Sequence, residues 1–552
     1  MNDIEIAKSI PLEEISKVAE RFGIFEDNLI PYGKYKAKID SKIFNELENK
    51  KDGKLILVTS INPTPLGEGK TTISIGLSDG LNKLGKKSIL ALREPSLGPV
   101  FGIKGGATGG GHSQIAPMDE INLHFTGDIH CITSANNLIS AMIDNHLYFG
   151  NELKFKKVIW KRCMDLNDRS LREIEVGLSD EKNMVPRKDG FDITVASEIM
   201  AIMCLSNNLK DFERRVGNII IGFNENDEPI RVSDIKAQGA VTALMKDALK
   251  PNIVQTLEHN LALIHGGPFA NIAHGCNSII ATKLALKLGE YVITEAGFGA
   301  DLGAEKFIDI KCRKSGLKPS AAVCVATIKA LKYHGGLDIE KCTSENIDAL
   351  ENGINNLLKH IDNIKNQYGV NVVVAINRFN FDTEKELEFL ANKLKEVNVE
   401  LSIAEVWKKG GEGAIDLAEK VIKIAKNPSI KFIYDEEDNI KTKIEKVAKK
   451  IYGAVGVEYS EEAEKEIMQI EKLGYKNYPV CIAKTQYSFS DDAKNLECME
   501  PFKIHVNDVI LKTGAEFIVV KTGKIFTMPG LPKVPIAENI YVDDNGDIVG
   551  IF

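Results

Sequence analysis

The residues best suited to chemistry lie in one short segment, 62–72, which contains two prolines, two glycines, a lysine and three threonines. An apolar run at 55–58 precedes it, and a helix-like segment follows it toward Gly80. A turn with little side-chain bulk points backbone N–H groups at phosphate oxygens, and the helix N-terminus adds a positive dipole end. The order strand, turn, helix therefore predicts a phosphate site, and an ordinary tight strand-to-helix turn is the alternative.

Most of this segment matches the pattern of a P-loop, although Thr64 stands five residues before Gly69, where the pattern has glycine. In that pattern Lys70 reaches the β and γ phosphates of a nucleotide. Thr71 holds a Mg²⁺ ion that is bound to the nucleotide. The predicted nucleotide-binding residues are Thr64, Pro65, Leu66, Gly67, Glu68, Gly69, Lys70 and Thr71.

A second buried strand is predicted at 88–92, and it ends at Arg93 and Glu94. Two such strands joined by a helix form a right-handed parallel crossover. Sheets of this type keep their ligands at the carboxyl ends of the strands, so Arg93 and Glu94 are predicted to face a ligand. For Arg93 the alternative is a surface ion pair with Glu94.

The α/β rhythm continues through further apolar runs at 261–264, 291–294, 321–326, 370–376 and 401–406. Segments rich in glycine, charge or aromatic residues follow most of them, where such a sheet binds ligands. These segments are 265–269, 295–301, 377–379 and 407–413. The run 102–114 is too rich in glycine for a helix or a strand, and we predict an ordered functional loop there.

The pattern predicts an α/β fold that is P-loop NTPase-like, with a mostly parallel sheet, helices on both faces and two smaller α+β domains. Residues 1–149 and 235–380 would form the nucleotide-binding core, with the stretch to about Asn49 helical. The charged stretch 150–234 is predicted to be an inserted subdomain. Residues 381–552 would form C-terminal domains that contribute to the second substrate site.

The composition restricts the class of protein. The chain has 552 residues, of which 43% are hydrophobic and 27% charged, which is typical of a soluble protein with two to four domains. Its net charge of −8 disfavours nucleic acid and anionic membranes as partners. The nine cysteines form no Cys-x-x-Cys pair, so neither a disulfide framework nor a zinc site is expected. No signal or membrane-spanning segment is visible, and a cytoplasmic location is expected.

Three long motifs, 64–71, 102–111 and 325–336, together resemble those of formate–tetrahydrofolate ligase, also called 10-formyltetrahydrofolate synthetase. The resemblance runs from about Pro11 to Phe552 in one order. It also includes 118–128, 265–278, 295–307, 484–492 and 528–533. So many motifs in one order are hard to obtain by chance.

The resemblance implies that formate attacks the γ-phosphate of ATP to give formyl phosphate, from which tetrahydrofolate then takes the formyl group. Lys70 and Arg93 would be the catalytic residues that hold the phosphoryl charge. Thr71 would hold Mg²⁺, and Glu94 would lie near a monovalent cation, K⁺ or NH₄⁺. The family likeness also suggests a homotetramer.

Folate carries a flat pterin ring that needs aromatic or apolar faces. Phe298, Phe379 and Trp407 match the aromatic residues that bind the pterin in the family. For each of them the alternative is a place in the hydrophobic core. Trp407 is one of only two tryptophans and directly precedes Lys-Lys-Gly-Gly.

Two other functions remain open from the residues alone. A P-loop switch ATPase would hydrolyse ATP to change its affinity for a protein partner, but it would not need the loop 102–114 or the aromatic residues at strand ends. Another P-loop ATP-dependent carboxylate ligase would share the phosphoryl chemistry and differ in the acceptor. Dependence of ADP release on formate would separate these functions.

Overall fold

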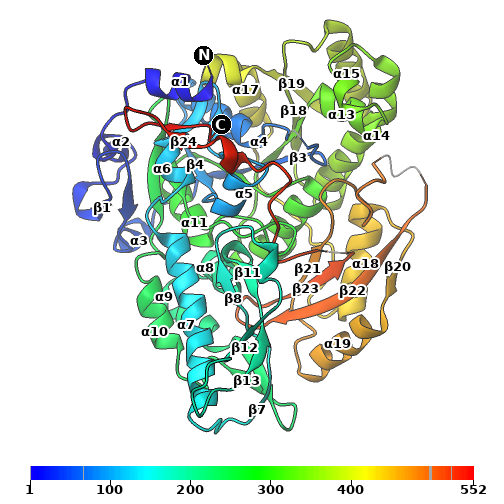
Figure 1. Ribbon diagram of the computed structural model, residues 1–552. Helices are drawn as coiled ribbons and strands as arrows, with labels where there is room; N and C mark the ends of the chain where they lie inside the picture. Colours follow the sequence, from blue (N-terminus) through cyan, green and yellow to red (C-terminus); the bar gives the residue numbers. More distant parts are fainter. Residues whose placement is uncertain (1, 66, 497–499, 524, 552) are drawn as a thin grey trace.

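A large mixed sheet lies at the centre of the computed structural model, which describes residues 2–65, 67–496, 500–523 and 525–551 (Figure 1). Its main path has the order β1-β2-β14-β15-β4-β16-β3-β17-β18-β19. The bounds in this order are Leu29–Pro31, Ala37–Ile39, Asn252–Thr256, Leu261–Ile264, Ser88–Leu92, Tyr291–Glu295, Lys54–Ser60, Ala321–Ala326, Val372–Asn377 and Glu400–Ala404. A short hairpin of β5 (Gly109–Gly110) and β6 (Ser113–Ala116) joins it at β14.

Within the described chain, the neighbours from β15 to β19 all pair in parallel. Alternate residues of β3 face opposite sides, since Leu55 and Leu57 belong to one apolar cluster and Ile56 and Val58 to another. Both faces are therefore covered, as the almost continuous apolar runs require. The α/β class and the mostly parallel sheet are confirmed.

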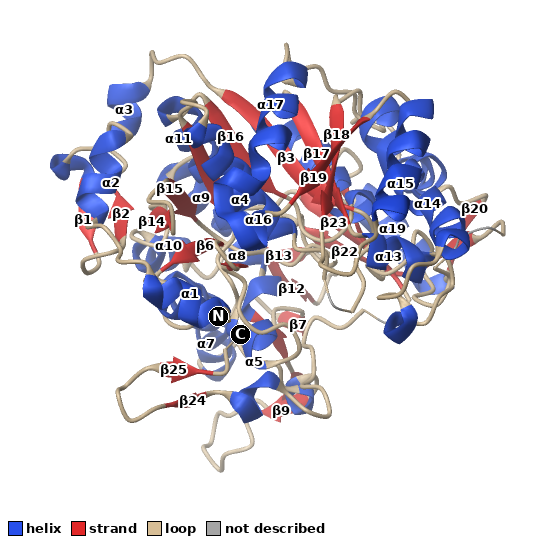
Figure 2. Ribbon diagram, turned by 90° about the horizontal axis from the view of Figure 1, so that it is seen from above, coloured by secondary structure: helices blue, strands red, loops and turns tan. Residues whose placement is uncertain are grey.

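Helices cover both faces of this sheet. α4 (Lys70–Lys83) and α17 (Ile415–Ile424) pack on the face that contains Ile56 and Val58, and Figure 2 shows them in front of the band of strands. α11 (Ile279–Leu288), α13 (Ile328–His334) and α14 (Ile347–Asp362) pack on the other face. Because α4 starts directly after the predicted P-loop, its N-terminus lies at the carboxyl edge of β3.

Two expectations about local structure are wrong. The first 49 residues are not all helical, because β1 and β2 form a hairpin around Gly33 and β2 pairs with β14. The buried positions Ala37 and Ile39 explain this, since they extend the sheet at its edge. The glycine-rich run 102–114 also contains strand, because β5 and the start of β6 pair in it.

A second sheet lies in the C-terminal part, in the order β20-β22-β23-β21. These strands span Gly456–Tyr459, Lys503–Lys512, Phe517–Thr522 and Val480–Ala483. β22 and β23 run antiparallel, and the other two pairs are parallel. Both faces of this sheet are buried, because Val480 and Ile482 belong to one apolar cluster and Cys481 and Ala483 to another.

The stretch 150–234 forms small sheets and two helices, α8 (Glu198–Leu205) and α9 (Leu209–Gly217). Every residue of α8 is buried. The predicted domain boundaries stay predictions, and β19, which lies beyond residue 380, pairs with β18 in the large sheet. Among the described residues, no helix is long and apolar enough to cross a membrane.

A buried ion pair joins α13 to α15 (Glu384–Glu396). Lys332 Nζ lies 2.8 Å from Glu386 Oε1, and both side chains are fully buried. We predict that Lys332→Met lowers the free energy of unfolding by about 3–5 kcal/mol, because it leaves the Glu386 charge buried without its partner. The shift of the urea midpoint measures this loss.

Lys341→Met is the matched control for this variant. Lys341 pairs with Asp338 at 3.1 Å, but both side chains are mostly exposed. An exposed pair contributes about 1 kcal/mol or less, so the control should unfold close to wild type. Equal midpoints for the two variants would contradict the importance of the buried pair.

Candidate active site

The turn after β3 has the backbone shape that its glycines allow. Gly67 and Gly69 have φ values of 74° and 71°, in the left-handed region that favours glycine. A Cβ atom on Gly69 would lie 2.4 Å from Nδ2 of Asn377, so a larger residue does not fit there. Leu66, also predicted to bind the nucleotide, lies outside the described residues.

Hydrogen bonds of Glu68 connect this turn to the carboxyl ends of the next two strands of the sheet. Its buried carboxylate accepts hydrogen bonds from Thr64 N and from Thr327 Oγ1, each at 2.8 Å. Burial raises the pKa of Glu68. Asn377, at the end of β18, donates to the Glu68 carbonyl at 3.3 Å. The turn is therefore fixed against the carboxyl ends of both β17 and β18.

Lys70 is half-buried at the start of α4, and not fully exposed as a loop lysine would be. Its Nζ donates to the carbonyl of Phe298 at 2.7 Å. Burial lowers the pKa of Lys70 to about 7, which Glu295 opposes and Arg93 reinforces. Since an ammonium has three N–H donors, two remain for an anion.

Thr71, in the first turn of α4, and Glu295, the last residue of β16, bring two oxygen ligands together. Thr71 Oγ1 donates to Glu295 Oε2 at 3.2 Å. In the described part of the chain, the other oxygen, Glu295 Oε1, is buried without a hydrogen-bond partner. Hydroxyl and carboxylate oxygens are ligands that Mg²⁺ prefers, so the pair fits that ion.

Arg93 and Glu94 follow β4 at the same edge. Arg93 Nη1 donates to the carbonyl of Pro268 at 3.2 Å. Glu94 Oε2 is buried and makes no hydrogen bond within the described ranges. Burial raises the pKa of Glu94 well above its usual range; the Asp128 charge adds to this shift and Lys38 opposes it. An unpartnered carboxylate oxygen of this kind fits a cation.

A pocket brings these side chains together. Thr71, Arg93 and Glu94 line it, and so do Lys104 and Glu295, which the sequence analysis did not select. Lys104 lies in the glycine-rich run, and burial of its ammonium end lowers its pKa, to which Arg93 adds. With Lys70 close by, three cationic side chains meet two carboxylates, an arrangement suited to an anion that carries a metal ion.

The aromatic residues predicted to bind folate lie farther from one another than the charged residues of the pocket do. The backbone carbonyl of Phe298 accepts the hydrogen bond from Lys70. The φ of Phe298 is 59°, which is unusual for a residue other than glycine. Phe379 follows β18, is 39% exposed and stacks on Phe381 with ring centroids 5.4 Å apart. Among the described residues, no hydrogen bond or ring stacking joins Phe379 to Phe298.

Trp407 lies in the short helix α16 (Val406–Lys409) and is 46% exposed. Its Nε1 donates to Asp3 Oδ1 at 3.0 Å, and its backbone packs so closely on Gly111 that a Cβ there would lie 2.0 Å from the Trp407 carbonyl. The described contacts of Trp407 are thus with the N-terminal helix α1 (Asp3–Ser9) and the β5–β6 hairpin.

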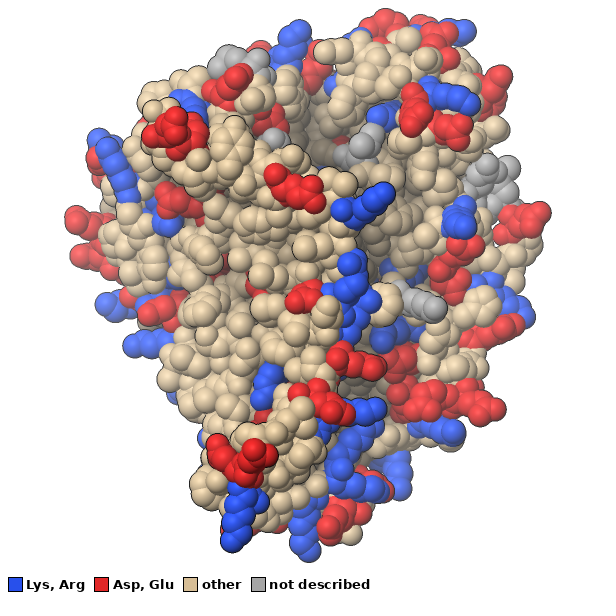
Figure 3. Space-filling model, in the orientation of Figure 1, with Lys and Arg blue, Asp and Glu red and all other residues tan. Residues whose placement is uncertain are grey.

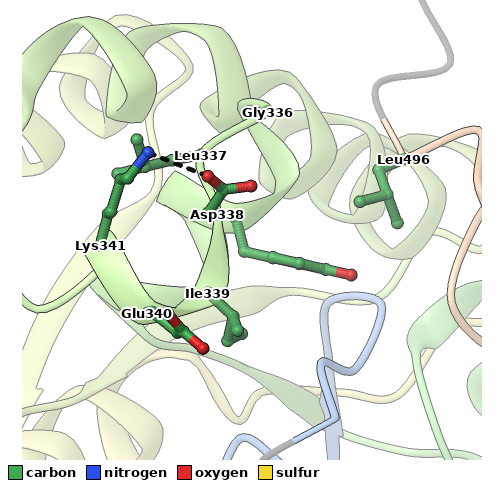
Figure 4. A pocket seen from close by; sticks show the side chains of 8 residues that line it. Gly336, Leu337, Asp338, Ile339, Glu340, Lys341 and Leu496 are labelled. Carbon is green, nitrogen blue, oxygen red and sulfur yellow. Dashed lines mark hydrogen bonds and ion pairs between the residues drawn. The ribbon is translucent and has the colours of Figure 1, made fainter.

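The surface shows two hollows of different character. Figure 3 shows a hollow in the upper part of this face, in the region where Figure 1 places β3 beside α13 and α14, with acidic and basic side chains interspersed over the rest. Another pocket is lined by Tyr333, Leu496 and 336–341, and its ion pair Lys341–Asp338 is drawn in Figure 4. None of the described residues predicted to bind a substrate or a metal lines this pocket, although Tyr333 and Gly336 belong to the motif 325–336.

Compared with known protein families, the chain matches the family model described as formate–tetrahydrofolate ligase over residues 1–552, which is its full length. Enzymes of this family use ATP to join formate to tetrahydrofolate. The match covers the turn after β3, the glycine-rich run and the segments that follow β16, β18 and β19.

The lowered pKa of Lys70 leads to a pH prediction. Above about pH 7 the free enzyme loses this ammonium, whereas a bound triphosphate favours the charged form. We predict that ATP affinity falls by up to about tenfold per pH unit between pH 7 and 8.5. Calorimetry at pH 8 in buffers of different ionisation enthalpy should show proton uptake on binding.

Lys70→Arg is the control, because a guanidinium stays charged over this pH range. Any change of affinity that remains in this variant reports the titration of ATP itself. In that variant the affinity should change little over the same pH range. Equal affinities of the wild-type enzyme at pH 7 and 8.5 would show that Lys70 does not set the pH dependence.

Proposed function

We propose that this chain, which belongs to the formate–tetrahydrofolate ligase family, activates formate as formyl phosphate before the formyl group passes to tetrahydrofolate. The overall reaction consumes formate, ATP and tetrahydrofolate and yields 10-formyltetrahydrofolate, ADP and phosphate. The observation that carries the proposal is the pocket in which Arg93 and Lys104 lie with Thr71 and Glu295 beside the predicted P-loop.

The proposed reaction has two steps. One formate oxygen attacks the γ-phosphorus of ATP, the bond to the bridging oxygen breaks, and ADP leaves. N10 of tetrahydrofolate then attacks the formyl carbon, loses its proton, and expels phosphate, which keeps the formate oxygen. Formate alone would have to expel an oxide ion, whereas phosphate leaves readily once cations hold its charge.

Lys70 and Arg93 are the proposed catalytic residues. Phosphoryl transfer needs positioning and charge neutralisation more than covalent help from the protein. Lys70 is held by the Phe298 carbonyl and Arg93 by the Pro268 carbonyl, so both cations are oriented before the substrate binds. Fixed donors of this kind stabilise developing charge without having to reorganise.

Two cations complete the proposed site. Thr71 and Glu295 would hold Mg²⁺, and Glu94 would supply an oxygen to a monovalent cation, K⁺ or NH₄⁺. Support comes from the buried oxygens Glu295 Oε1 and Glu94 Oε2, which make no hydrogen bond with any described residue. Bound to ATP, Mg²⁺ neutralises charge on the β and γ phosphates.

Phe298, Phe379 and Trp407 are the proposed pterin-binding residues. Phe379 and Trp407 support this assignment because each follows a strand of the sheet and keeps more than a third of its surface exposed, free to pack on a flat ring. The P-loop NTPase-like architecture, the domain boundaries and a homotetrameric assembly remain proposals from the motifs and the family resemblance.

Isotope transfer tests the intermediate. Formate labelled with ¹⁸O should deliver one labelled oxygen to inorganic phosphate in each turnover, measured by mass spectrometry of the phosphate. Arg93→Ala should suppress labelled phosphate more strongly than it weakens folate binding. Unlabelled phosphate, in a reaction that still forms 10-formyltetrahydrofolate, would contradict a formyl phosphate intermediate. A switch ATPase would also give unlabelled phosphate, because the oxygen that hydrolysis adds to the phosphoryl group comes from water.

Removing the indole tests the folate site. We predict that Trp407→Ala weakens tetrahydrofolate binding by about 1–3 kcal/mol, the range for a large apolar contact, while the KM for ATP changes little. Trp407→Phe keeps an aromatic face but loses the hydrogen bond to Asp3, and it should retain most of the affinity. An unchanged KM for folate in Trp407→Ala would return this residue to a purely structural role.

A further inference from the structure

Lys104 is a cation of the active-site pocket to which the chemistry above gives no task. It lines the pocket together with Arg93, Glu94 and Glu295. It comes from the glycine-rich run and not from the end of a sheet strand. The residue as a whole is exposed, so its position is not required by core packing.

Lys104 also differs from its two cationic neighbours in its contacts. Lys70 donates to the carbonyl of Phe298 and Arg93 to that of Pro268. The ammonium of Lys104 has no hydrogen bond or ion pair with any residue of the described ranges, although it lies close enough to Arg93 for that charge to lower its pKa. The Glu295 carboxylate offsets part of the repulsion between Lys104 and Arg93, and an anion bound to both cations would offset more of it.

The backbone that carries Lys104 is shaped by its neighbours. Lys104 N donates to the carbonyl of Pro99, in the helix α5 (Leu97–Phe101), at 3.1 Å. Gly105 follows with a φ of 67°, and a Cβ atom on it would lie 3.1 Å from the carbonyl oxygen of Ile551. A residue other than glycine at 105 would therefore strain this backbone and press on the C-terminal segment.

The C-terminal segment holds the glycine-rich run at two points. Ile536 N donates to the carbonyl of Gly102 at 2.8 Å, and Gly106 N donates to that of Ile551 at 2.9 Å. Figures 1 and 2 both show this end of the chain beside α5. Residues 102–106 are thus fixed on both sides of Lys104.

We propose that Lys104 binds the carboxylate of formate and that residues 536–551 act as a strap that positions it. This inference rests on the proposed function. Formate and the γ-phosphate are both anions, so bringing them together requires positive charge beyond that which holds the phosphate. One charge-assisted hydrogen bond from Lys104 to a formate oxygen leaves the other oxygen free to attack phosphorus.

The walls around this cation fit a small acid. Pro99, Val100 and Phe269 line the same pocket with apolar surface. A one-carbon carboxylate needs one strong polar contact and little room. Apolar walls also favour exclusion of water from formyl phosphate, the proposed mixed anhydride. Formate is the smallest carboxylate, and it is the acid that the family uses.

The experiment compares the kinetic constants of three lysine variants. Lys104→Met should raise the KM for formate about 10- to 100-fold, the effect of losing one charge-assisted hydrogen bond, while the KM values for ATP and tetrahydrofolate stay within about twofold. Lys104→Arg keeps the charge and should recover most of the formate affinity. Lys51→Met removes an exposed lysine before β3, at the opposite edge of the sheet, and should behave as wild type.

Gly105→Ala tests the strap. It should raise the KM for formate about 3- to 10-fold without changing the KM for ATP, because it displaces Lys104 but leaves Lys70 in place. In the double variant Lys104→Met/Gly105→Ala, the second change should add nothing, since the contact it disturbs is already lost. Additive effects would overturn the role of residues 536–551 as a positioning strap.

Two other results would overturn the role of Lys104. An unchanged KM for formate in Lys104→Met would remove it from the formate site. A KM for ATP that rises as much as that for formate would place it in the phosphate clamp. If instead the wild-type enzyme releases ADP without formate, the proposed function itself fails, so the two failures are distinguishable.

Discussion

The parallel alignment of neighbouring strands is the constraint on which the active site depends. Because the described neighbours β4, β16, β3, β17 and β18 run in the same direction, their carboxyl ends meet at one edge. Arg93 follows the first of these strands and Glu295 ends the second. Thr327, directly after β17, and Asn377, the last residue of β18, hold Glu68. A sheet with alternating directions would put half of these groups at the far edge.

Charge at this edge is arranged before any substrate binds. Lys70 is half-buried, and burial lowers its pKa to about 7 although the Glu295 carboxylate opposes the shift. Glu94 is a buried acid, and burial raises its pKa, which disfavours its negative charge in the empty site. Such imbalances destabilise the empty protein, and the proposed nucleotide and cations would relieve them. The same side chains that weaken the fold locally therefore favour binding.

Those parts of the site that depend on local pattern could be predicted from the sequence. The strand at 88–92 and the turn before Lys70 follow from apolar runs and glycine spacing. Glu295 was visible only as one polar residue among several after a strand, because its contact with Thr71 depends on which strands are neighbours. The strands at 29–31 and 37–39 were missed because they are short and depend on pairing with a distant strand. Lys104 was missed because its approach to Arg93 depends on tertiary folding of a glycine-rich run.

Both ends of the chain contact that glycine-rich run, and this links its two halves to different parts of the site. Asp3 accepts hydrogen bonds from Gly111 N and from Trp407 Nε1, so the N-terminal helix joins the hairpin to a proposed folate residue. At the other end of the chain, Ile551 accepts from Gly106 N, two residues after Lys104. The residues that make these contacts lie far apart in the sequence, so the contacts depend on the tertiary fold. The proposed formate site and the proposed folate site are thus each fixed in part by hydrogen bonds with a residue near one end of the chain.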